Sequence, residues 1–197
     1  MIFQEVRFLI QGMTPLMMSN PQAMMLVPDE GEIKRTKIKA KPTREEQAEL
    51  AAYRHEDGTL VFPAIAFRNG LLSVATSYKP PKSKKSMAHY VAHVRPTEEY
   101  VPILNEDGLP ISDYIIDTRK GVNNNCRPPA GIVLHRPKIN SWQVNLGLLY
   151  HPEFIGVENP SEWLQKLLND AGALNGVGAF RPQKKGWFGM YQVKQIL

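Results

Sequence analysis

The chain has 197 residues, of which 43% are hydrophobic and 22% charged, a composition typical of one soluble globular domain over residues 1–197. Its 24 Lys and Arg against 19 Asp and Glu give a net charge of +5, which favours a polyanionic partner. The single cysteine, Cys126, excludes an internal disulfide framework and a cysteine-rich zinc site. The charged N-terminal stretch and the lack of a long apolar run predict a cytoplasmic protein with no membrane partner.

The first predicted element is a half-buried strand over residues 3–11. Val6, Phe8 and Ile10 fall on one face of this segment because successive side chains of a strand point to opposite sides. Residues 16–59 lack a sustained core pattern, so we interpret them as an insertion that leaves the core.

A short helix is predicted inside this insertion, because Thr43 and Glu46 have the spacing of a capping box; we expect it to run to about Tyr53. Apolar residues with helical spacing then predict a core helix over residues 64–75. Arg68 lies near the start of that helix, where it either contacts a phosphate or covers the helix surface.

Strands are predicted next at residues 100–104, 114–118 and 142–150, with a turn at residues 105–108. The segment 117–137 is a second insertion, because the chain passes through a polar and basic tip at residues 119–129 before it returns as residues 132–136.

The clearest helix pattern follows Asn159, an N-cap residue with Pro160 at the first helical position. We expect this helix to stop at Gly172. Its predicted buried stripe consists of Trp163, Leu164, Leu167, Leu168 and Ala171. A closing strand is predicted at residues 190–197. The order of elements predicts an α+β, ferredoxin-like (RRM-like) core with long hairpin and loop insertions.

Residues 176–189 combine glycines, cations and aromatic side chains between the last helix and the last strand. Glycine lets backbone amides approach a ligand, cations meet phosphate, and aromatic rings stack on bases or fill the core. The segment is therefore a candidate phosphate-cradling loop, with a plain β-turn as the alternative.

The candidate nucleic-acid contacts are cations, glycines and rings on this loop, on the hairpin and on the basic runs: Lys34, Arg35, Lys37, Lys39, Lys41, Arg68, Lys82, Lys84, Lys85, Arg119, Lys120, Arg127, Arg136, Gly178, Arg181, Lys184, Lys185, Trp187 and Phe188. Met24 and Met25 are candidates for a base wedge or a subunit contact, with core packing as the alternative. The basic runs at residues 34–41 and 82–85 have a second interpretation, as a charged strand edge and a solubilising loop.

Three segments resemble the RAMP superfamily of CRISPR-associated proteins: Phe62 to Arg68, Asp117 to Lys120, and Gly176 to Gly189. The chain looks most like the backbone subunits that polymerise along a guide RNA. The resemblance implies that the glycine-rich loop and basic residues of the first core helix hold RNA phosphates, and that the hairpin inserts between bases as a thumb. It also implies a role in antiviral defence, and a phage or mobile element can carry such a protein.

No catalytic motif is evident. His89 and His93 lie four residues apart, but no carboxylate joins them in a zincin pattern, and His55, His135 and His151 sit in no recognisable motif. We therefore expect no catalytic residue, metal or cofactor. The expected function is non-catalytic binding of single-stranded RNA or, alternatively, single-stranded DNA, by a protein that forms homo-oligomers or joins other ribonucleoprotein subunits. The alternatives are a RAMP-type endoribonuclease and a phage assembly or protein-interaction protein.

Overall fold

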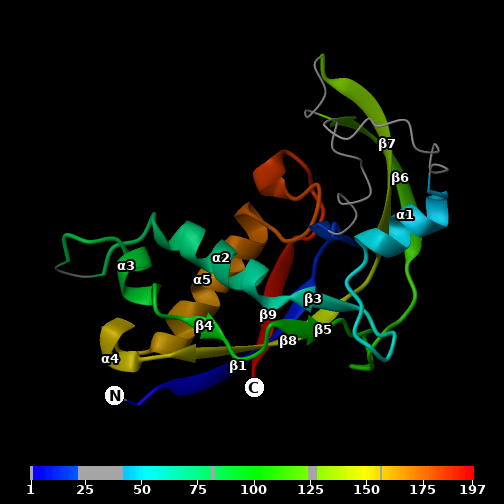
Figure 1. The fold of residues 1–197 in the computed structure, drawn as a ribbon. Coiled ribbons are helices and arrows are strands. Elements are labelled where there is room, and N and C mark those ends of the chain that lie inside the picture. The colour runs from blue at the N-terminus through cyan, green and yellow to red at the C-terminus, as the bar shows by residue number, and fades with distance from the viewer. Residues whose placement is uncertain (1, 22–41, 81–82, 124–127, 156) are drawn as a thin grey trace, which may run out of the picture.

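The computed structural model describes residues 2–21, 42–80, 83–123, 128–155 and 157–197. Over these residues the protein is a mixed α+β structure whose strands pair antiparallel (Figure 1). The elements in chain order are β1 (Gln4–Gly12), β2 (Leu16–Met17), α1 (Arg44–Ala51), β3 (Val61–Pro63), α2 (Ala64–Ala75), α3 (Met87–Val91), β4 (Arg95–Pro96), β5 (Tyr100–Pro102), β6 (Ile115–Asn123), β7 (Ala130–Ile139), β8 (Gln143–Tyr150), α4 (Pro152–Ile155), α5 (Pro160–Leu174), the 3-10 helix η3 (Pro182–Lys184) and β9 (Tyr191–Ile196).

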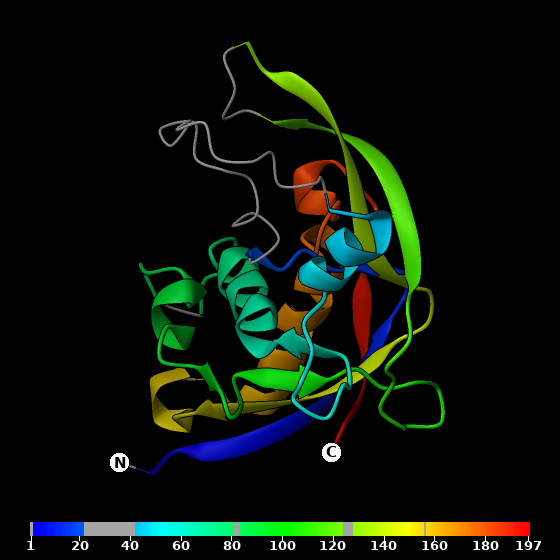
Figure 2. The ribbon, with the colours of Figure 1, turned by 45° about the vertical axis from the view of Figure 1, so that its right-hand side comes forward.

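The main sheet has the strand order β4-β8-β1-β9, so β1 and β8 lie at its centre. Phe8 of β1 pairs with Leu146 of β8, and both side chains are fully buried. Helices α2 and α5 cover this apolar face of the sheet (Figures 1 and 2). The core therefore forms between two helices and one face of a four-stranded sheet, and the predicted alternation of the first strand is confirmed.

The two main helices form where the apolar spacing predicts them. Helix α2 has the predicted bounds, and α5 begins at Pro160. The stripe of α5 is buried as expected at Leu164, Leu167, Leu168 and Ala171, while Trp163 is only partly buried against it.

The predicted end of α5 at Gly172 is wrong, since the helix continues to Leu174. A Cβ at Gly172 would lie 2.0 Å from the carbonyl oxygen of Tyr191 in β9. Glycine is needed at this position because the helix and the strand approach closely, and not because the helix terminates there.

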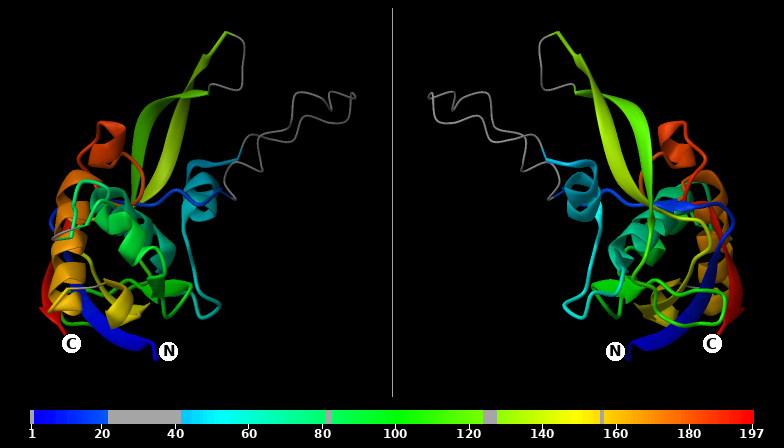
Figure 3. Two further views of the ribbon diagram at one scale, coloured as in Figure 1. Left: turned by 90° about the vertical axis from the view of Figure 1, so that its left-hand side faces the viewer. Right: turned by 90° about the vertical axis from the view of Figure 1, so that its right-hand side faces the viewer.

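Strands β6 and β7 form a long hairpin that projects from the body, and β2 joins it through β7 (Figure 3). Both strands are longer than predicted: Arg119 and Lys120, expected at the tip, lie inside β6 and pair with Leu134 and Val133. Their polarity suggested a loop, but cross-strand pairing holds them extended.

The predicted capping box is confirmed, because Thr43 accepts a hydrogen bond from the Glu46 amide while Glu46 accepts one from the Thr43 amide. Helix α1 ends at Ala51, two residues before the predicted Tyr53. Of the helices described, none has both the length and the apolar character needed to span a bilayer.

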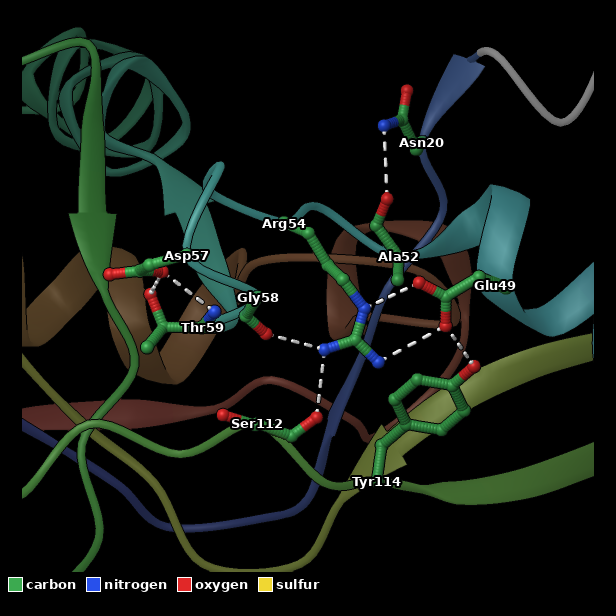
Figure 4. A network of polar contacts seen from close by, with 9 residues as sticks. All are labelled: Asn20, Glu49, Ala52, Arg54, Asp57, Gly58, Thr59, Ser112 and Tyr114. Carbon is green, nitrogen blue, oxygen red and sulfur yellow. Dashed lines mark hydrogen bonds and ion pairs between the residues drawn. The ribbon is translucent and has the colours of Figure 1, made fainter.

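Arg54 ties the insertion to the base of the hairpin (Figure 4). Its guanidinium pairs with Glu49 and donates hydrogen bonds to the carbonyl oxygens of Gly58, at 2.7 Å, and Ser112, at 2.9 Å. Glu49 also accepts a hydrogen bond of 2.7 Å from Tyr114, just before β6. The contact with Arg54 lowers the pKa of Glu49, and burial together with Glu49 raises the pKa of Tyr114 to about 12.

Candidate nucleic-acid interface

The glycine-rich loop, residues 176–189, is fastened to the segment around β2. Gly178 has φ +78, and a Cβ there would lie 2.4 Å from the carbonyl oxygen of Met17. Gly189 has φ +67, and a Cβ there would lie 1.8 Å from the carbonyl oxygen of Val177. Both positions need glycine, as predicted, but the backbone that approaches them is the chain's own.

Most amides of this loop have acceptors within the protein. The Ala179 amide donates to Met17 at 2.8 Å, and the Gly189 amide donates to Pro15 at 2.8 Å. The amides of Val177, Gly186 and Phe188 also donate to carbonyl oxygens of the loop itself. A ligand here would therefore meet the side chains of the loop rather than these amides.

A cleft of 710 Å³ lies between α2, the glycine-rich loop and β7. No Asp or Glu is among the described residues that line it. The lining residues are Ser19, Tyr53, Phe62, Pro63, Ile65, Ala66, Asn69, Gly70, Ser73, Arg136, Asn175, Gly176, Val177, Gly178, Ala179, Phe180, Arg181, Gln183 and Lys184. A volume of this size lies within the range of small-ligand sites in proteins.

Arg136 of β7 is the half-buried cation of this cleft. Burial lowers the pKa of its guanidinium, and among the described residues no carboxylate forms an ion pair with it. Its partner is the Phe180 ring, whose centroid is 5.3 Å from the guanidinium carbon. Because a partly desolvated cation gains most from a nearby anion, Arg136 marks a position where an anionic ligand would be stabilised.

Arg181 and Lys184 bring two more cations to the cleft, and neither has an acidic partner within the described part of the chain. Arg181 donates to the carbonyl oxygen of Gly178 at 3.0 Å and to the Gln183 side chain at 2.9 Å, which orients its guanidinium. The cleft thus combines three cations with no acid among the described residues that line it. The hairpin carboxylate Asp117 lies opposite Arg136 across the two strands, but its ion pair is with Arg119.

Arg119 is engaged by other groups of the protein, although 39% of its side-chain surface stays exposed. Its guanidinium donates to Asp117 at 2.6 and 3.2 Å, and it lies 4.6 Å from the Phe188 ring centroid and 5.7 Å from that of Phe180. Trp187 extends this cation–aromatic stack, since its ring lies 4.7 Å from that of Phe188. Arg119 therefore fixes the hairpin against the glycine-rich loop, and Trp187, 56% exposed, ends the stack in solvent.

Phe180 is held at a positive φ of 52, a conformation that is uncommon for an aromatic residue. Its carbonyl oxygen accepts a hydrogen bond of 3.1 Å from the Phe188 amide. This backbone geometry directs the ring between Arg119 and Arg136, so the strained position belongs to the wall of the cleft.

Several predicted contacts lie away from the cleft. Arg68 donates to the carbonyl oxygens of Ala92 and Val94, at 2.7 and 3.0 Å, and so anchors α2 to the segment before β4. Lys84 and Lys85 precede α3, where Lys85 contacts His89 at 3.0 Å. These two lysines do not line the cleft. The same holds for three other predicted contacts, Arg68, Lys120 and Lys185.

Lys120 lies on the other face of the hairpin from Arg119 and Arg136, since successive residues of a strand alternate between faces. The remaining predicted contacts lie outside the described residues: Lys34, Arg35, Lys37, Lys39, Lys41, Lys82, Arg127, Met24 and Met25.

Three exposed, uncharged residues of α2 line the cleft and were not among the predicted contacts. Ile65, Asn69 and Ser73 follow one another at four-residue spacing, are exposed and line the cleft. The available signal was that α2 contains one charged residue in twelve, Arg68, whereas a helix face that meets only solvent normally carries charges.

Of the histidines, His93 and His151 contact each other, whereas His135 lies on the hairpin. Helix α3 ends at Val91, so His89 and His93 do not share a helix face. His93 accepts a hydrogen bond of 2.8 Å from the His151 amide, and His135 contacts Thr118 at 2.8 Å on the hairpin. Within the described ranges, no three His, Cys, Asp or Glu residues lie close enough to hold a metal ion.

No protein-family model matches this chain, and no curated protein matches it either.

Proposed function

We propose that the protein binds single-stranded nucleic acid, RNA in the first place, in the cleft between α2 and the glycine-rich loop, without catalysing a reaction. The observation that carries the proposal is the half-buried guanidinium of Arg136, which forms no ion pair among the described residues and lies in a cleft whose described lining has no acid. Asp117, its cross-strand neighbour, is neutralised by Arg119. Arg181 and Lys184 add positive charge, and phosphate is the anion that a strand would present repeatedly to these groups.

A ferredoxin-like core of the RAMP type is part of this proposal. The elements β1, α2, β4, β8, α5 and β9 follow the order β-α-β-β-α-β, and the sheet order β4-β8-β1-β9 leaves the second and fourth of these strands at the edges. The projecting hairpin beside the cleft fits the thumb that this resemblance implies (Figure 3). We propose that copies of the chain, or other ribonucleoprotein subunits, assemble side by side along the strand.

The cleft is a better candidate than the open face of the main sheet. RRM domains stack bases on aromatic side chains of that face. Here the outward positions of β1 are Glu5, Arg7, Leu9 and Gln11, and Asn145 and Leu149 pair with Leu9 and Glu5 from β8. Because these positions carry no ring, the centre of the sheet face, as far as it is described, offers a strand no stacking platform. The exposed ring of Phe3 lies before β1 and contacts Arg95 and two histidines.

Binding of a fluorescent single-stranded RNA across a salt titration tests the proposal. We expect affinity to fall steeply with salt, because each phosphate contact contributes about −0.7 to the log–log slope for single strands. Arg136→Met keeps an apolar stem against Phe180 but removes the charge, so it should weaken binding and make the slope shallower by about 0.7.

Lys194→Ala is the matched control, since Lys194 is an exposed cation of β9 outside the cleft. It should bind as the wild type does. A wild-type slope near zero, or equal loss of binding in both variants, would contradict phosphate binding in the cleft.

A further inference from the structure

The cleft has walls of different chemistry. Arg136, Arg181 and Lys184 come from β7 and the glycine-rich loop, whereas the wall formed by α2 carries no charge. A site that binds only the phosphates of a strand needs no more than cations. The uncharged wall therefore suits another part of the same ligand, one that carries no charge.

The uncharged wall combines apolar and hydrogen-bonding groups. Ile65 is 48% exposed although it is a large apolar residue, and Asn69 and Ser73 extend the same row of α2. The Asn69 side chain has one hydrogen bond among the described residues, a long one of 3.4 Å from Arg68 to its side-chain oxygen. No hydrogen bond within the described chain occupies the Asn69 amide nitrogen or the Ser73 hydroxyl. These two groups are free to meet a ligand.

A small side chain lies beside these residues. Ala66 also lines the cleft, so a flat ligand can approach the helix closely at this position. Tyr53, which packs against Phe62 just before α2, and Phe180 of the glycine-rich loop are aromatic residues of the same lining. An apolar surface, rings, and an amide with a hydroxyl at the edge are the groups that proteins use to bind unstacked nucleobases.

We propose that the α2 wall binds one nucleobase of the strand, so that the protein selects for base identity at one position. This inference rests on the proposed function, because the phosphate of the same nucleotide would meet the cationic wall. Ile65 and Ala66 pack on the base, and Asn69 and Ser73 hydrogen-bond to its edge.

Selection from a random library of RNAs of about ten nucleotides, a length within the usual site size, tests the inference. The wild type should enrich one base about tenfold over the least favoured at a single position, as a good side-chain contact to a base edge gives. The double change Asn69→Ala, Ser73→Ala should reduce that enrichment to below twofold. Both side chains are exposed, so circular dichroism should show an unchanged fold.

The double variant should keep the salt slope of the wild type, since the cations remain. Asn145→Ala, which removes an exposed amide from the open face of the sheet, should leave both base selection and slope unchanged. Base binding would be overturned if the wild type enriched no base but its affinity fell steeply with salt, or if the double variant kept the wild-type enrichment. Either result would leave phosphate binding intact. A wild type that binds no RNA would overturn both.

Discussion

At the scale of single residues, two glycines inside helices differ in how closely neighbouring groups approach them. In α5, Gly172 allows close contact with β9, where a Cβ would lie 2.0 Å from the Tyr191 carbonyl oxygen. In α2, a Cβ at Gly70 would lie 3.4 Å from the Cβ of Ala171, an ordinary contact, so packing does not require glycine there.

Gly70→Ala should therefore stabilise the protein by about 0.5–1 kcal/mol, the usual gain when alanine replaces glycine inside a helix. Gly172→Ala should destabilise it by about 1–3 kcal/mol, because the new methyl group forces α5 and β9 apart. Urea denaturation of both variants measures the difference. Equal effects of the two substitutions would show that the spacing between α5 and β9 does not determine the cost.

At the scale of elements, α1 and the hairpin are held together through Glu49, Arg54 and Tyr114. The contact with Arg54 lowers the pKa of Glu49, so this carboxylate stabilises the fold above its unfolded pKa, and the contribution is lost as the pH falls through the lower folded value.

Glu49→Gln should consequently lower the melting temperature near pH 7. It should also reduce the further loss of stability that the wild type suffers between pH 5 and pH 3, a window that spans the ordinary carboxyl pKa of about 4.3 and extends below it. Thermal melting at the three pH values checks this. Glu46→Gln, within the capping box, is a control that leaves the contact with Arg54 intact. If the two variants lose stability in parallel with the wild type over the acid range, the Glu49 contact does not contribute to acid sensitivity.

Some of the elements were predictable, but others were not, and neither was the cleft. The two-residue strand β4 at the edge of the main sheet and the short helices α3 and α4 are too brief for a periodic pattern, and the strand predicted at residues 100–104 pairs with β3 outside the main sheet. Apolar spacing is a local property, so it located β1, α2 and α5 within a few residues. The cleft depends on contacts between segments that are distant in sequence, such as Arg136 with Phe180. Counting charges identified Arg136, Arg181 and Lys184, but could not show that Arg119 is paired with Asp117 or that Arg68 faces the other side of α2. Asn69 and Ser73 carry no charge, so a search for phosphate contacts passed over them.

At the scale of the whole molecule, the hairpin and the glycine-rich loop project on one side of the body, while the main sheet lies on the other (Figures 1 and 3). A strand in the cleft would pass along that projecting side, where a second copy can bind the next stretch of the same strand.

Native mass spectrometry should therefore find one copy on an RNA of about ten nucleotides and several on one of about forty, since single-strand sites usually cover roughly 4–16 nucleotides. The number of copies should rise with RNA length at constant protein excess. One copy on every length would contradict assembly along the strand, and several copies without RNA would indicate self-association instead.

The fastening of the glycine-rich loop to Pro15 and Met17 has a consequence for protein synthesis. The cationic hairpin leaves the ribosome before the glycine-rich loop that completes the cleft. This loop can adopt its folded conformation only when it contacts residues 15–17, whose carbonyl oxygens accept its hydrogen bonds. A nascent chain would thus display basic residues before the proposed binding cleft is complete, and the cleft can be completed only after Gly189 has been synthesised.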